Sequence, residues 1–137
     1  MMEVKKTGVK IHVGVDILGL PYANIITTAN VTDRNGAIEM FSQPNFSLPT
    51  LKTVLCDGGY TGKNFADAIR ELTGAEVQVA KRSELHTFAV IPKRWIVERT
   101  FGWLDKCRRL WKNCERKLEN TLNMFKLAIV LLLLKRF

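Results

Sequence analysis

Apolar and other side chains alternate from Val9 to Val15, and this period of two restricts the segment to a strand with one buried face. A turn with Gly19 and Pro21 follows, and Tyr22–Thr28 is rich in β-branched residues, so this part of the chain predicts a β-hairpin. Periodicity and flanking glycine or proline predict two more strands, at 52–56 and 76–80, and helices at 35–41, 62–72, 92–115 and 118–136. Interspersed strands and helices are typical of a mixed α/β fold.

The length, charge and cysteine content of the chain indicate how many domains, what kind of partner and which cellular compartment to expect. A chain of 137 residues is expected to form one domain, here residues 1–137. Its net charge of +8 suits a polyanionic partner such as DNA, although a basic surface can also serve solubility alone. The cysteines number 3, with no C-x-x-C pair, which indicates neither a disulfide framework nor a zinc site. A reducing, cytoplasmic location fits this cysteine content.

Neither the N-terminal nor the C-terminal segment has the sequence pattern of a signal peptide or a membrane-spanning helix. The first ten residues carry charges without an apolar stretch behind them, so no signal peptide is expected. The apolar run Leu127–Leu134 is far shorter than the roughly 20 residues that span a bilayer. We therefore predict a buried helix that ends on Lys135 and Arg136, where positive charge suits the helix dipole.

Glu98 is the first candidate for chemistry. On a helical wheel it lies at the middle of a polar face that also holds Arg94 and Gly102, while apolar side chains gather on the other side. A solvated glutamate contacting Arg94 would explain this position. However, Gly102 costs a helix about 1 kcal/mol relative to alanine and leaves space one turn beyond the carboxylate. A functional role and a solvated role both stay open.

Asp57 is the second candidate, because it ends an apolar strand and precedes Gly58 and Gly59. Ligands of α/β proteins bind at the carboxyl ends of strands, but aspartate before glycine is also common in turns. If Asp57 and Glu98 reach one place, their hard oxygen ligands, without histidine or cysteine, suit Mg²⁺ or Mn²⁺.

Three blocks of the sequence resemble one protein family. They are KKTGVKIHVGVDILGLPYANIITTANVTDR (5–34), LCDGGYTGKNF (55–65) and KRWIVERTFGWLDKCRRL (93–110). The last two contain the D-x-G-Y and W-x-x-E-R-x-F-x-W-L patterns of bacterial insertion-sequence DDE transposases. The blocks occur in the family's order and cover nearly the whole chain.

The resemblance implies a ribonuclease H-like fold, a mixed sheet flanked by helices, in which three carboxylates hold two Mg²⁺ ions for cutting and joining DNA phosphodiesters. It implies that Asp57 and Glu98 are the second and third catalytic acids and metal ligands. Arg94 and Lys106 match basic positions that lie beside DNA in relatives. The basic side chains that we expect to contact DNA are Lys93, Arg94, Arg99, Lys106 and Arg109.

The first acid of the family lies on a strand upstream of the segment that begins at Gly8, and residues 1–7 contain no aspartate. We therefore expect a partial catalytic domain that lacks its first strand, and whether it is an enzyme stays open. Asp16 is expected in the hairpin turn, Asp33 in a loop or helix cap, and His12 in a structural role.

Three functions remain at this stage. The chain could be a partial enzyme of DNA transposition that a longer fusion completes. It could be a non-catalytic fragment that binds DNA, or that inhibits full-length transposase by binding it or its partners. The expected partners are thus DNA and either full-length transposase or a second copy of the chain itself. It could also be a nonfunctional relic whose basic helix is merely solvated.

Overall fold

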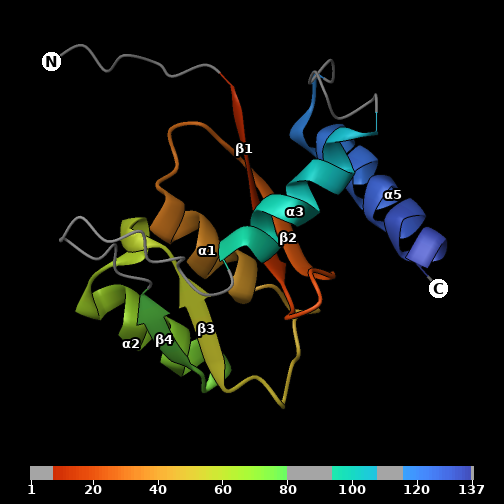
Figure 1. Ribbon diagram of the computed structural model, residues 1–137. Coiled ribbons are helices and arrows are strands. Elements are labelled where there is room, and N and C mark those ends of the chain that lie inside the picture. The colour runs from red at the N-terminus through yellow and green to blue at the C-terminus, as the bar shows by residue number, and fades with distance from the viewer. Residues whose placement is uncertain (1–7, 80–93, 108–115, 137) are drawn as a thin grey trace, which may run out of the picture. The chain divides into compact units, whose positions relative to one another are not determined.

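The computed structural model describes residues 8–79, 94–107 and 116–136 (Figure 1). Its contacts divide the chain into two compact units. Unit 1 comprises Met1–Val31 and Trp95–Phe137, and unit 2 comprises Thr32–Arg94. The expectation of a single domain, residues 1–137, stays a prediction.

Unit 1 contains the predicted hairpin, in which β1 (Val9–Val15) pairs antiparallel with β2 (Pro21–Thr28). Asp16 builds the turn between the strands, because its Oδ1 accepts hydrogen bonds from the N–H of Leu18 at 2.9 Å and of Leu20 at 2.8 Å. Gly19 adopts φ 84° in this turn, a left-handed conformation that is unfavourable for residues with a Cβ atom. Asp16 is therefore a turn residue, as predicted.

Two helices pack on the hairpin within unit 1, namely α3 (Arg94–Asp105) and α5 (Leu118–Arg136). The buried side chains of their shared core are Ile26, Leu104, Phe125, Ala128 and Ile129. No helix among the described residues is long and apolar enough to cross a membrane. The predicted basic end of α5 is confirmed, since Lys135 and Arg136 lie in its last turn. The predicted burial of the apolar run Leu127–Leu134 is wrong for one face of α5, where the exposed side chains are Leu127, Val130, Leu131 and Leu134.

The predicted long helix from 92 to about 115 is shorter where the structure describes it. After Asp105 the chain tightens into a turn, with the N–H of Cys107 donating to the carbonyl of Leu104 at 2.9 Å. This three-residue hydrogen bond replaces the four-residue bond that would continue an α-helix. Residues 108–115 lie outside the described residues.

Unit 2 begins with α1 (Asp33–Phe41) and continues as strand, helix and strand, namely β3 (Thr53–Cys56), α2 (Lys63–Thr73) and β4 (Glu76–Val79). β3 and β4 are parallel. Parallel strands need a crossover connection between them, and α2 provides it here. Ala37, Phe65 and Ile69 form the buried core between these elements. The mixed α/β class predicted from the sequence is thus confirmed.

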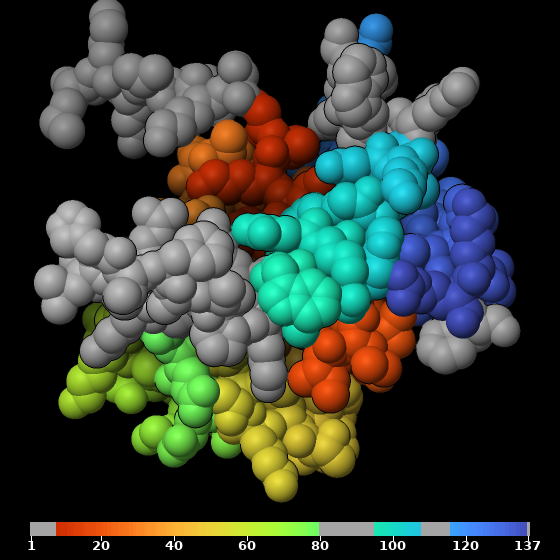
Figure 2. Space-filling view, viewed as in Figure 1, coloured from red at the N-terminus to blue at the C-terminus, as the bar shows by residue number. Residues whose placement is uncertain are grey.

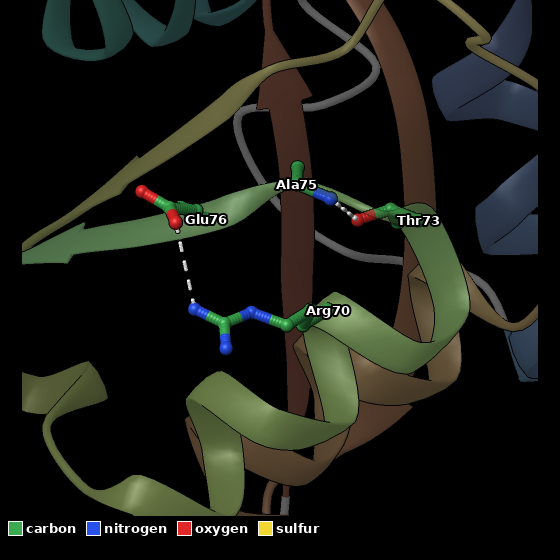
Figure 3. A network of polar contacts seen from close by, with 4 residues as sticks. All are labelled: Arg70, Thr73, Ala75 and Glu76. Atoms are coloured by element: carbon green, nitrogen blue, oxygen red, sulfur yellow. Dashed lines mark hydrogen bonds and ion pairs between the residues drawn. The ribbon is translucent and has the colours of Figure 1, made fainter.

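The connection from α2 to β4 turns at Gly74, whose φ is 74°. The hydroxyl of Thr73 accepts the N–H of Ala75 at 3.1 Å, immediately before the strand begins (Figure 3). Arg70 and Glu76 form an ion pair at 3.6 Å, but their side chains are 64% and 73% exposed. Because water screens such a pair, it contributes little to stability.

The predicted helix at 62–72 begins one residue later in the structure, because Gly62 is the N-cap residue of α2 and offers no side-chain hydrogen bond. Thr61 follows a short 3-10 helix, η1 (Gly58–Tyr60), and its carbonyl accepts a hydrogen bond from Arg34 at 3.0 Å. This use of the Thr61 backbone fixes the loop after Asp57.

Candidate metal and DNA site

Asp57 lies directly after β3, at its carboxyl end, and begins η1. Its Oδ1 accepts the N–H of Gly59 at 2.9 Å, so one carboxylate oxygen caps the 3-10 helix. The turn interpretation considered from the sequence therefore describes this contact correctly. A carboxylate has two oxygens, and capping through Oδ1 does not prevent Oδ2 from binding a cation.

The charge of Asp57 affects two neighbouring groups. Burial raises the pKa of the Cys56 thiol to about 11, and the negative charge of Asp57 adds to this increase. Burial also raises the pKa of Tyr60 to about 12, with further contributions from Asp33, Asp57 and Cys56. Asp33, in the first turn of α1, thus adds a second negative charge near Tyr60. The end of β3 is therefore an electronegative place, which favours cations.

Glu98 is exposed on α3, as the wheel predicted. The opposite face is buried, with Ile96 6% exposed and both Thr100 and Leu104 1% exposed. A Cβ atom added at Gly102 would meet no atom of the described residues within 4 Å. The carboxylate therefore lies on an open helix surface where a large ligand can approach.

The structure describes Asp57 in unit 2 and Glu98 in unit 1, and their convergence stays a prediction. Within the described ranges, no three His, Cys, Asp or Glu side chains lie together so that they could hold a metal ion. Two carboxylates suit Mg²⁺ in kind but fall short of the donors that two ions require.

The basic residues predicted to contact DNA have different surroundings. Lys106 is exposed just after α3, whereas Arg99 is half-buried within unit 1. Arg94 is the first residue of α3. Lys93 and Arg109 lie outside the described residues.

His12 has the structural surroundings expected of it. It is 7% exposed in β1, and its Nε2 lies 2.9 Å from the Thr27 hydroxyl on the neighbouring strand. A buried imidazole paired in this way supports the hairpin.

A stack of rings and guanidinium groups on α3 was missed by the sequence analysis. Arg99 lies between the rings of Trp95 and Trp103, with its Cζ 4.6 Å and 4.7 Å from their centroids. Arg136, at the end of α5, lies 3.5 Å from the centroid of Trp103. The spacing of four residues between Trp95, Arg99 and Trp103 was visible in the sequence, because such residues stack on one helix face. The contribution of Arg136 required the tertiary fold.

The raised pKa of Cys56 predicts a poorly reactive thiol. At pH 8 a pKa of about 11 instead of 9.0 lowers the thiolate fraction about 100-fold. Alkylation of Cys56 by iodoacetamide, followed by mass spectrometry of its peptide, should be slower by about this factor than in the urea-unfolded chain. Equal rates in the folded and unfolded chains would contradict the prediction.

The sequence of this chain is similar to the sequences of known proteins. Residues 3–133 match the family described as the transposase DDE domain. The transposase named for insertion sequence element IS402 of Burkholderia cepacia is 32% identical over 121 residues, which are 83% of this chain and 57% of that protein. The chain thus spans little more than half the length of this relative, and no solved structure matches it significantly. With the match covering nearly all of its residues, the chain belongs to the transposase DDE domain family.

Proposed function

We propose that this chain is part of a DDE transposase catalytic domain which, in its complete form, cuts and joins DNA phosphodiesters with Mg²⁺ or Mn²⁺. The observation that carries the proposal is the placement of the two acids. Asp57 directly follows a parallel strand, and Glu98 lies on the open face of α3, in a chain of this family. Asp57 and Glu98 would be two of the metal ligands.

A ribonuclease H-like arrangement is proposed for the complete domain. The hairpin β1–β2 and the parallel pair β3–β4 are separate two-stranded sheets among the described residues. Two-stranded sheets have little stability by themselves and expose unpaired edges. A further strand, of the kind that carries the first acid in the family, would join them into one mixed sheet.

A non-catalytic role is the second candidate, as a fragment that binds DNA or inhibits a full-length transposase. The net charge of +8 supports DNA binding in either case, because clustered Lys and Arg release counterions from phosphates. Binding to DNA therefore does not separate the two candidates.

A Mn²⁺ titration tests whether the two acids share a site. Asp57→Asn and Glu98→Gln should each weaken Mn²⁺ binding at least about tenfold, or about 1.4 kcal/mol, by removing a charged ligand. Asp67→Asn is the matched control, because Asp67 is an exposed acid on α2 outside the proposed site. Its affinity should equal that of the unmodified chain. Equal affinities for all four proteins would exclude the shared site.

A DNA assay then separates the two candidates. DNA retention at about 50 mM salt, lost at higher salt, is expected for both. Mg²⁺-dependent nicking that Glu98→Gln abolishes would support the enzyme, whereas retention without nicking would support the binding fragment. Nicking that persists in Glu98→Gln would indicate a contaminating nuclease.

A further inference from the structure

Arg99 is held inside unit 1 by three contacts. Its guanidinium lies between Trp95 and Trp103, and its Nη2 donates a hydrogen bond to the carbonyl of Leu18 at 2.8 Å. Its Nε is buried and has no hydrogen-bond partner among the described residues. Figure 2 shows the surface of α3, in cyan, bordering the orange-red surface of the hairpin and the blue surface of α5.

Thr100 makes the neighbouring contact to the same turn. It is 1% exposed, and its hydroxyl lies 2.7 Å from the carbonyl of Gly19 and 3.0 Å from that of Ile96. A Cβ atom added at Gly19 would lie only 2.9 Å from the Thr100 hydroxyl, so the turn lies directly against the helix. Two adjacent residues of α3 therefore hold two adjacent carbonyls of the β1–β2 turn.

We propose that Arg99 and Thr100 are positioning residues that fix the rotation of α3 on the β1–β2 turn and thereby the direction of Glu98. Successive helix residues differ by about 100° around the axis, so anchoring two of them leaves one rotation of the helix. Glu98 immediately precedes this pair, and its direction is set with theirs. The role of Glu98 in this proposal rests on the proposed function, whereas the contacts of Arg99 and Thr100 do not depend on it.

The sequence suggested that Arg99 contacts DNA, whereas this proposal gives Arg99 a positioning role within unit 1. To bind a phosphate through Nη2, this guanidinium would have to give up its hydrogen bond to the carbonyl of Leu18, and leaving the stack would uncover more of the Trp95 and Trp103 rings. The planar, delocalised guanidinium suits stacking between two rings better than a lysine ammonium does. Lys106, whose side chain is exposed just after α3, is the better candidate for DNA.

Thermal unfolding and the salt dependence of DNA binding test the position of Arg99. Arg99→Gln should lower Tm by about 5–10 °C, whereas Lys106→Gln should change it by less than about 2 °C. In DNA binding, Lys106→Gln should reduce the slope of log K against log [salt] by about 0.9, while Arg99→Gln leaves the slope unchanged. An unchanged Tm for Arg99→Gln, or a reduced slope like that of Lys106→Gln, would overturn the proposal.

Mn²⁺ affinity separates positioning of Glu98 from general stability. Arg99→Gln and Thr100→Val should each weaken Mn²⁺ binding about threefold to tenfold, and Arg99→Lys should recover part of the loss. Ile129→Val is the destabilised control, since it removes a methyl group from the buried core of unit 1 and should leave the affinity unchanged. If Ile129→Val weakens binding equally, the positioning role is wrong. If Glu98→Gln itself has no effect, the proposed function fails, and Tm and the salt slope still decide the placement of Arg99.

Discussion

Replacing Phe125 with alanine should lower the free energy of unfolding by about 4 kcal/mol, the largest change in stability that we expect. Phe125 is 1% exposed and lies at the centre of the unit 1 core. Its removal leaves a cavity bordered by α3 and the hairpin, which the surrounding backbone cannot fill. Urea denaturation monitored by circular dichroism should show this loss as a lower midpoint.

Two further variants keep this prediction testable if Phe125→Ala does not fold. Phe125→Leu retains most of the apolar volume and should cost about 1–2 kcal/mol. Leu127→Ala is the matched surface control, because Leu127 is 61% exposed on the same helix and should change stability by less than about 0.5 kcal/mol. A similar midpoint for Phe125→Ala and Leu127→Ala would contradict the assignment of the core.

Replacing Ile69 with alanine should cost about 3 kcal/mol within unit 2. Ile69 is 0% exposed on α2 and packs with Phe65 and Ala37, so its truncation leaves a cavity beside the parallel strands. Hydrogen exchange should show faster exchange of the backbone amides in β3 and β4. Leu72→Ala, at a site 43% exposed on the same helix, should leave these amides protected. Equal exchange in both variants would show that Ile69 does not support the strands.

Local patterns predicted most of the fold of each unit. The alternation in β1, the turn glycine and the β-branched β2 each depend on neighbouring residues, and the hairpin follows from them. The end of α3 at Asp105 did not follow, because the apolar periodicity continues beyond it. The loop before α2 did not follow either, because the carbonyl of Thr61 accepts a hydrogen bond from Arg34 of another helix. Such contacts depend on tertiary structure and leave no local pattern.

In the candidate site, too, local sequence patterns predicted some features, whereas others depend on tertiary structure. The exposed position of Glu98 and the end-of-strand position of Asp57 follow from helix and strand periodicity. Arg99 shows the limit of this reasoning, because a basic residue beside a glutamate suggested a phosphate contact. Its stacking and its hydrogen bond to Leu18, which is 81 residues away in sequence, depend on how the helix meets the hairpin. Charge alone does not reveal such a structural use of arginine.

The division of the chain into units bears on the order of folding during synthesis. Unit 2 is one continuous segment, Thr32–Arg94, so all of its residues are translated before the second segment of unit 1, which begins at Trp95. Unit 1 requires its hairpin to wait for α3 and α5, with the whole of unit 2 translated in between. Contacts across so long a separation form slowly, because loop closure costs entropy before they are made. The apolar face of the nascent hairpin is therefore exposed to other chains and to chaperones until α3 and α5 have been translated.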